Sequence, residues 1–78
     1  MSDTVVVSDS AADAVRVKFN PSGDPAVAAI KQRTAELISI MEQVRERNSK
    51  LAAREASIAI TNLQTASMWC VLAVTKGL

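Results

Sequence analysis

The chain has 78 residues, of which 49% are hydrophobic but only 3% aromatic, and its formal net charge is +1. The absence of histidine and the single cysteine, Cys70, exclude an intramolecular disulfide and a Ser-His or Cys-His catalytic pair, and they argue against a zinc site. The near-neutral charge gives no overall footprint for DNA or RNA. Because so short a chain buries only a modest core, we expect self-association to supply part of its stability.

The first thirteen residues are rich in Ser, Asp and Ala and show no helical period. They carry three acids (Asp3, Asp9 and Asp13) and no base. We therefore expect residues 1–13 to form a flexible acidic tail and residues 14–78 to form the folded domain. The tail lacks the basic start of a secretory signal, and a free thiol fits a reduced, cytoplasmic compartment.

Residues 14–19 (AVRVKF) alternate between apolar and basic side chains. In an extended segment, Phe19 would face the side opposite to Arg16 and Lys18. A segment this short leaves both a strand and a single helical turn open.

The next six residues, NPSGDP (20–25), predict a loop that leads into a helix. Gly23 can adopt a positive φ without steric cost. Asp24 is suited to accept hydrogen bonds from the free N–H groups at a helix start, and Pro25 fits the first helical position. The loop therefore predicts a helix that begins at Pro25.

A first long helix is expected over residues 25–47, with apolar side chains spaced at alternate steps of three and four, as in a coiled-coil seam. The members of this seam are Val27, Ile30, Thr34, Leu37, Met41 and Val44. Aliphatic residues of this kind favour an all-α core of close-packed helices. The polar run RERNSK (45–50) then predicts a turn at Asn48 and Ser49, with Ser49 capping the next helix.

A second helix is expected over residues 50–76, ending before Gly77, a favourable residue just past a helix end. One stripe of mostly small residues would let this helix approach the first closely, which predicts an antiparallel hairpin. The stripe comprises Ala52, Ala56, Ala59, Leu63, Ala66, Cys70 and Ala73.

The C-terminal half of this second helix is apolar nearly all round, and Ile58, Trp69 and Leu72 point away from the small-residue stripe. Two helices cannot cover so many apolar sides, so other copies of the chain must do so. We therefore expect a symmetric homo-oligomer. The longest apolar run, residues 68–74, is interpreted as too short to span a bilayer.

Catalytic chemistry has little support. Glu42 and Glu46 share a helix face, but Arg45 and Arg47 flank them, and we interpret the two carboxylates as solvated. Cys70 lies in the apolar run without a nearby base, which predicts a buried, unreactive thiol. The sequence thus predicts no enzyme, no metal and no cofactor.

A site for an anionic small molecule has more support. Phe19 offers a stacking face, the loop ends at a helix N-terminus whose free N–H groups attract anions, and Lys31 follows two turns later. The candidate residues in this region are Phe19, Asn20, Ser22, Gly23 and Lys31. On the second helix, Arg54 shares a face with Ser57 and Thr61, and a guanidinium with hydroxyls suits phosphate.

Each candidate also has an ordinary structural interpretation, which the residues alone leave open. A phenylalanine such as Phe19 is more often a hydrophobic cap on a helical bundle than a stacking residue. Arg54 fits a solvated helix surface, and Thr61 fits a hydroxyl that bonds back to its own helix.

The segment REASIAITNLQTASMWCVLAVTKG (54–77) resembles the characteristic helix of the phage anti-CBASS cyclic-oligonucleotide sponges, and it is similar to the hairpin domain of the Thoeris anti-defence sponges. The matching features are Arg54-Glu55, the run from Ser57 to Thr61, Ala66 and Trp69. The upstream segment FNPSGDPAVAAIKQRTAELI (19–38) resembles the loop and first long helix of that family.

This resemblance implies a non-enzymatic protein in the host bacterial cytoplasm that traps cyclic di- or trinucleotides, the signals of bacterial immune synthases. It implies a compact helical oligomer, typically a hexamer, with pockets between protomers. Phe19 matches the aromatic residue that stacks on a base, and Lys31 matches a basic residue on phosphate. Arg54 with Thr61 would belong to a second, symmetry-related site.

Two departures from the family pattern concern the ligand. The family's loop aromatic is often a tyrosine, and Phe19 lacks its hydroxyl; Asn62 stands where a basic residue usually follows the threonine. Cyclic ADP-ribose isomers are therefore an alternative ligand class. A helical oligomer that binds proteins and no nucleotide is a further alternative.

Overall fold

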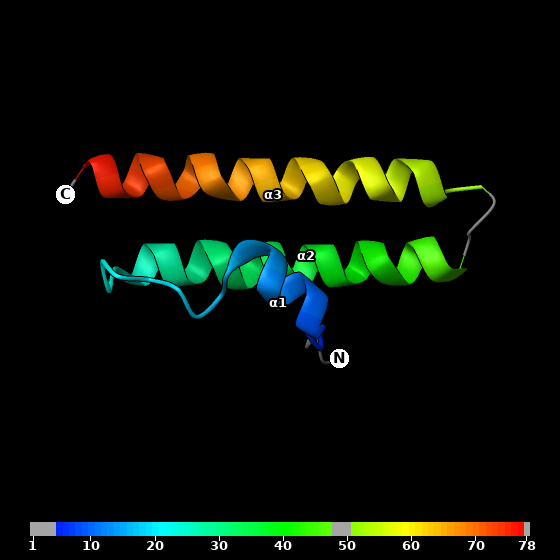
Figure 1. Cartoon of the computed structure of the whole chain (residues 1–78), viewed down its shortest axis with the longest axis horizontal. Coiled ribbons are helices and arrows are strands. Elements are labelled where there is room, and N and C mark those ends of the chain that lie inside the picture. Colours follow the sequence, from blue (N-terminus) through cyan, green and yellow to red (C-terminus); the bar gives the residue numbers. More distant parts are fainter. Residues whose placement is uncertain (1–4, 48–50, 78) are drawn as a thin grey trace.

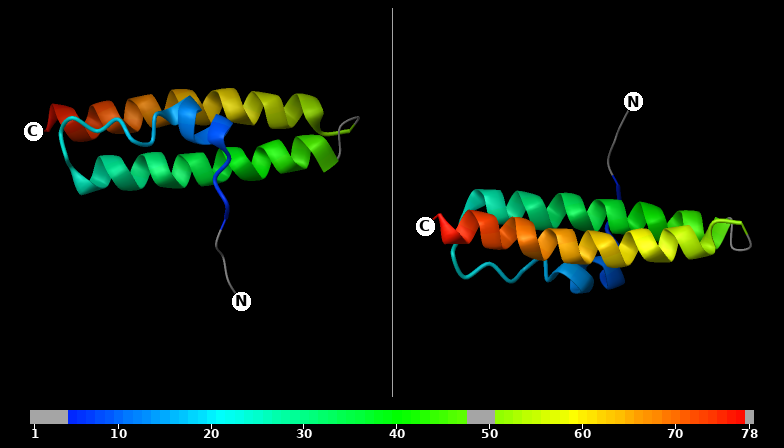
Figure 2. Two further views of the ribbon diagram at one scale, coloured as in Figure 1. Left: turned by 60° about the horizontal axis from the view of Figure 1, so that its bottom comes forward. Right: turned by 90° about the horizontal axis from the view of Figure 1, so that it is seen from above.

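The computed structural model describes residues 5–47 and 51–77. The described residues form three helices, α1 (Asp9–Val15), α2 (Pro25–Arg47) and α3 (Ala53–Lys76). α2 and α3 run side by side in opposite directions, and α1 with the segment after it covers one side of this pair (Figure 1, Figure 2). No strand occurs in these two ranges, so the all-α prediction is confirmed, and residues 14–19 are helix and turn rather than strand.

The N-terminal helix α1 corrects one expectation. A flexible tail was expected over residues 1–13, but residues 9–13 lie in α1. Ser8 is the N-cap of this helix, and its hydroxyl accepts a hydrogen bond from the Ala11 N–H at 3.1 Å. Ala11 and Val15 are buried in the hydrophobic core. Tertiary packing, rather than intrinsic propensity, therefore stabilises a helix of only seven residues.

Glu42 of α2 connects the start of α1 to the hairpin. Its two carboxylate oxygens accept hydrogen bonds from the hydroxyls of Ser8 and Ser10, each at 2.5 Å. The Ser8 N–H donates to the Ser39 hydroxyl at 3.0 Å. The bond from Ser10, followed by the bond from Ser8, lowers the pKa of the Glu42 carboxyl below its usual range. Glu42 therefore has a structural role instead of being simply solvated.

The helix ends show how local sequence sets their positions. Gly23 has φ +67°, as its place in the loop predicts. The Asp24 carboxylate accepts a hydrogen bond from the Ala26 N–H at 2.7 Å, which confirms Asp24 as a cap for α2. Gly77 follows α3 with φ −77°, so that helix ends without a left-handed residue. The turn and the helix cap expected at residues 48 and 49 lie outside the described residues.

The buried face of α2 lies about one residue away from the predicted seam. Its buried residues are Val27, Lys31, Ala35, Ile38 and Ser39. Leu37, a member of the predicted seam, is about half exposed. The difference arises because α2 packs against both α1 and α3, so the face between these two neighbours is the one removed from water.

The predicted small-residue stripe holds only in the first half of α3. Ala56 is buried and Leu63 packs against the core, but farther along the buried residue is Ser67 instead of its neighbour Ala66. Cys70 is exposed in the single chain, so the prediction of a buried thiol is wrong for this state. In the second half of α3, the face that packs against α2 is therefore shifted by about one residue from the predicted stripe.

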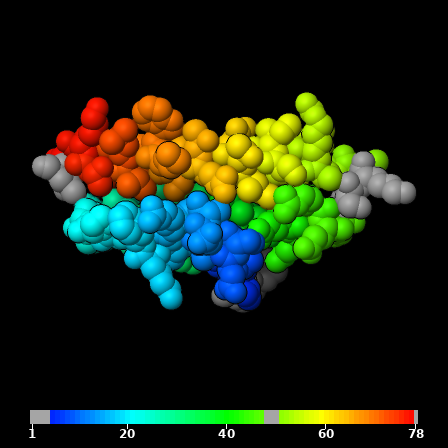
Figure 3. All heavy atoms as spheres, in the orientation of Figure 1, coloured from blue at the N-terminus to red at the C-terminus, as the bar shows by residue number. Residues whose placement is uncertain are grey.

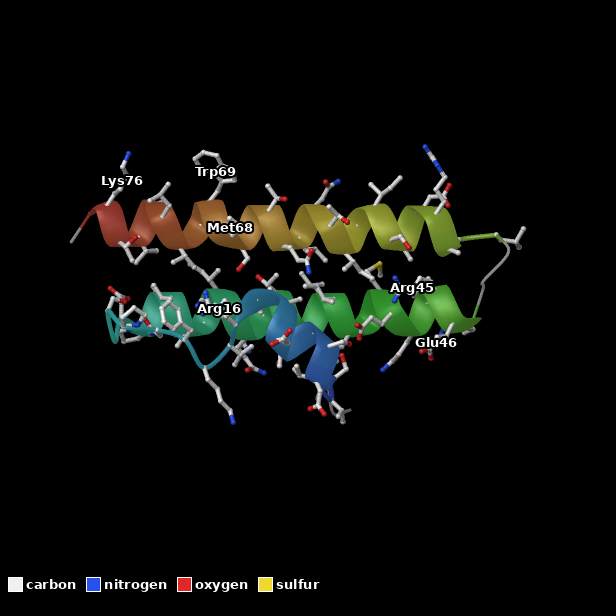
Figure 4. All side chains as sticks on the ribbon, viewed as in Figure 1. Arg16, Arg45, Glu46, Met68, Trp69 and Lys76 are labelled. Atoms are coloured by element: carbon white, nitrogen blue, oxygen red, sulfur yellow. The ribbon has the colours of Figure 1, made fainter. Side chains whose placement is uncertain are left out.

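The opposite face of α3 exposes large apolar side chains, as the sequence predicted. Met68 and Trp69 are 72% and 67% exposed, and Ile58 and Leu72 are also exposed. Trp69 points away from α2 (Figure 4). The single chain therefore leaves this face, formed by Ile58, Trp69 and Leu72, uncovered; it is called the apolar face of α3 below, and Met68 lies beside it, toward the segment that joins α1 to α2.

The length and composition of α3 bear on the expectation about membranes. From Ala56 to Thr75 this helix carries no charged residue. Its 24 residues are long and apolar enough to cross a membrane by length and composition alone.

Candidate ligand-binding site

Phe19 belongs to the segment that joins α1 to α2, and this segment runs along the hairpin toward the end where α3 finishes (Figure 1). Its side chain is 51% exposed, which is high for an aromatic ring. Figure 3 shows this segment packed against the C-terminal half of α3. The ring therefore lies at the border between a helical surface and solvent, where a flat ligand could stack on it.

Lys31 of α2 binds the backbone of this segment. Its ammonium donates hydrogen bonds to the carbonyl oxygens of Arg16, at 3.1 Å, and Phe19. The side chain is only 8% exposed. Burial, and secondarily the nearby Arg16 guanidinium, lower the pKa of the Lys31 ammonium. The sequence predicts Lys31 as a phosphate ligand, but two of its three donors bind the protein's own backbone.

Arg16 is the residue of this region that the sequence did not single out. It follows α1 with φ +55° and ψ +57°, a left-handed conformation that is uncommon for a residue with a Cβ atom. Its guanidinium carbon lies 4.4 Å from the centroid of the Phe19 ring. An extended segment would have placed Arg16 and Phe19 on opposite sides. Nothing in the sequence signals that the chain turns sharply at this arginine.

Three hollows meet around Phe19. The largest, of about 460 Å³, lies between the α1–α2 segment and α3 and falls in the size range of small-molecule sites. Its lining includes the cationic side chains Arg16 and Lys31 and no carboxylate, together with Phe19, Gln64, Ser67 and Met68. Hollows of about 330 Å³ and 130 Å³ also border Phe19. This combination of an aromatic ring, cations and an apolar wall suits a nucleotide.

The loop candidates lie beside the smallest hollow. Asn20 and Ser22 line it, together with Lys31. The Ser22 hydroxyl donates to the Asn20 side-chain oxygen at 2.8 Å, and the Asn20 amide donates to the Asp24 carbonyl at 3.1 Å. Gly23 has open space where a Cβ would lie. The structure thus groups Phe19, Asn20, Ser22 and Lys31, although the loop's polar groups largely satisfy one another.

The second predicted group lies at the opposite end of the hairpin, near the start of α3 (Figure 1). Arg54 is exposed. The Ser57 hydroxyl accepts a hydrogen bond from the Arg45 guanidinium at 3.4 Å. The Thr61 hydroxyl donates to the Ser57 carbonyl at 3.2 Å, which is the ordinary back-bond to its own helix. One chain therefore does not bring these residues together with Phe19.

No group of His, Cys, Asp or Glu side chains with the spacing of a metal site occurs in the described ranges.

Comparison with known proteins adds one finding. The family model described as "Acb2/Tad1, hairpin domain" matches residues 10–75 of the chain. This range includes the Phe19 segment, α2, and all but one terminal residue of both α1 and α3. No curated protein and no solved structure matches the chain.

Proposed function

Since the chain belongs to the Acb2/Tad1 hairpin-domain family, we propose that it is a phage anti-defence sponge that binds cyclic oligonucleotide immune signals, cyclic di- or trinucleotides, without cleaving them. It would act in the cytoplasm of the bacterial host. This function requires tight binding and no turnover. A small protein without histidine meets these requirements.

The observation that carries the proposal is the hollow beside Phe19. A half-exposed aromatic ring stands next to two cations, and no carboxylate lines the hollow. Stacking on the ring would hold a base, and the local positive charge would attract a phosphodiester. The net charge of +1 does not oppose this, because only charge close to the ligand is needed.

We also propose that the working form is a symmetric homo-oligomer, with a hexamer as the expectation from the family resemblance. Support comes from the apolar face of α3, which the single chain leaves uncovered. A protein interface suits this helix better than lipid does. Its uncharged residues include exposed Thr61, Asn62 and Thr65, and burying their polar groups in lipid costs free energy. Assembly would bury the apolar side chains and leave polar partners for these groups.

A second ligand site, formed by Arg54, Ser57 and Thr61, is proposed for the far end of the hairpin. Arg54 and Thr61 are exposed on α3. The Thr61 back-bond to its own helix leaves its hydroxyl oxygen able to accept a further hydrogen bond. A neighbouring protomer would have to supply the stacking surface, because the described part of this end has no aromatic residue.

The test is ligand depletion followed by recovery. The protein is mixed with cyclic di- and trinucleotides and, separately, with cyclic ADP-ribose isomers, and free ligand is measured before and after denaturation. Depletion with intact ligand released on denaturation supports a sponge, and the ligand series shows which class is taken. Degraded ligand would instead mean an enzyme. No depletion of any candidate would favour a helical protein-interaction module.

A further inference from the structure

The positions of Arg16 and Lys31 deepen the proposed function, on which this inference rests. We propose that Arg16 is the phosphate-binding cation of the Phe19 pocket and that Lys31 is a positioning residue, which holds the backbone that presents Arg16 and Phe19. The sequence pointed to the opposite assignment, with Lys31 on phosphate and no role for Arg16.

Lys31 is poorly placed to bind a ligand directly. Its ammonium already donates to the carbonyl oxygens of Arg16 and Phe19, and the residue is only 8% exposed. To reach a phosphate, it would have to give up both bonds, which would leave the Phe19 carbonyl without this donor and the Arg16 carbonyl with only its bond from the Phe19 N–H at 2.9 Å. Two of its three donors therefore serve the fold before they can serve a ligand.

Arg16, in contrast, has donors to spare. Arg16 is exposed, and among residues 5–47 and 51–77 its guanidinium forms no ion pair. The ion pair found in these ranges joins Arg33 to Glu36. Its guanidinium lies over the Phe19 ring at 4.4 Å, while the Lys31 nitrogen is farther away at 5.3 Å. The two larger hollows are both lined by Arg16 and Phe19, so this pair stands on the border between them.

The backbone at Arg16 explains how its side chain reaches the Phe19 ring. Arg16 is the C-cap of α1 and has φ +55°, the left-handed conformation that commonly ends a helix. The Val17 N–H donates to the Ala12 carbonyl at 3.0 Å, and the Arg16 carbonyl accepts both the Phe19 N–H at 2.9 Å and the Lys31 ammonium at 3.1 Å. The result is an arginine turned back over the aromatic ring three residues later.

Ligand binding would then proceed by exchange. An exposed cation–ring contact is weaker than a charge-assisted hydrogen bond to phosphate. A base arriving at Phe19 takes the place of the guanidinium on the ring, and the displaced guanidinium pairs with the phosphate attached to that base. Arg16 thus keeps the ring covered in the free protein and favours ligands that bring both a flat base and an anion.

The test measures binding of cyclic dinucleotides and trinucleotides by calorimetry at two salt concentrations. The variant is Arg16→Gln, and the matched control is Arg33→Gln on the exposed side of α2. We expect Arg16→Gln to weaken binding by about 10–100-fold, the range for one charge-assisted hydrogen bond. The salt dependence should also flatten, while the melting temperature stays within a few degrees of wild type. Arg16→Lys should recover part of the affinity, and Arg33→Gln should bind as wild type.

Lys31→Met separates the two roles. If Lys31 positions the segment, this variant lowers both the melting temperature and the affinity. Loss of affinity with unchanged stability would make Lys31 the phosphate ligand and overturn the proposal. If Arg16→Gln binds the ligand as tightly as Arg33→Gln does, the assignment of Arg16 is wrong, while the sponge function is unaffected. A wild-type protein that binds none of the cyclic nucleotides would refute the sponge function and this inference together.

Discussion

The Lys31 ammonium donates a hydrogen bond to the carbonyl oxygen of Arg16, fifteen residues earlier in the chain, at 3.1 Å. This bond joins the interior of α2 to the point where α1 ends. Lys31, which the sequence predicts as a ligand contact, therefore stabilises the segment that carries Phe19. The geometry of the candidate site thus depends on a contact that links two distant parts of the sequence.

Replacing Lys31 by methionine should destabilise the chain by about 1–3 kcal/mol, because the partly buried carbonyl of Phe19 loses its ammonium donor and the Arg16 carbonyl keeps only the Phe19 N–H. Urea unfolding followed by circular dichroism measures this. Lys18→Met is the control, since Lys18 is an exposed base of the same segment. Equal stabilities for the two variants would show that the carbonyl groups find water instead.

Glu42 should make folding stability depend on acid pH. Its carboxyl pKa is lowered in the folded chain, chiefly by hydrogen bonds from Ser10 and Ser8. A lowered folded pKa gives stability that is fully present above the ordinary value of 4.5 and is lost as the pH falls through the folded value. Unfolding free energies measured from pH 7 down to pH 3 should therefore decline below about pH 5.

The Glu42→Gln variant tests the origin of that decline. It should be less stable than wild type at pH 7 and should change less as the pH falls, because its amide does not titrate there. Glu46→Gln, one turn later and exposed, should follow the wild-type profile. A Glu42→Gln profile that parallels wild type would mean that other carboxylates cause the acid sensitivity.

The helix cap at Asp24 should contribute about 1 kcal/mol to stability. Its carboxylate accepts the Ala26 N–H at 2.7 Å at the start of α2. Asp24→Ala removes this acceptor, whereas Asp24→Asn keeps an oxygen in the same position. We expect thermal unfolding to shift downward for the alanine variant and to change little for the asparagine variant. Similar losses for both would point to the negative charge rather than to the hydrogen bond.

Trp69→Lys should dissociate the proposed oligomer without unfolding the chain. Trp69 is 67% exposed in the single chain, so the change costs little in the monomer. An added charge would, however, be buried at an interface between copies. Sedimentation velocity reports the assembly state, and circular dichroism reports helix content. Gln43→Lys, at an exposed position of α2, is the charge-matched control. An unchanged sedimentation coefficient for Trp69→Lys would show that the apolar face of α3 is not part of the interface.

The loop 20–25 shows how far local sequence can determine structure. Its Gly23 adopts a positive φ, and its Asp24 caps the helix that begins at Pro25, as predicted. Both effects act within a few residues, through steric freedom and a nearby hydrogen bond. They need no distant partner, so the residue types are sufficient to predict them.

The N-terminal segment shows the opposite case. Residues 9–13 were predicted as tail because they are acidic and lack a helical pattern, yet they lie in α1. What stabilises α1 is the burial of Ala11 and Val15 and the bonds from Ser8 and Ser10 to Glu42. The two hydrogen bonds to Glu42 join positions more than thirty residues apart, and no local pattern can encode such contacts.

The sequence by itself determined the all-helical class, the capped start of α2 and the exposed apolar set on α3, because helix periodicity and capping act over short distances. It also identified Phe19 as the exposed aromatic of the candidate site. The tertiary structure decided which face of α2 is buried, because α1 and α3 cover it together. It also placed Arg16 over the Phe19 ring, since a left-handed bend held by Lys31 reverses the direction that an extended segment would give.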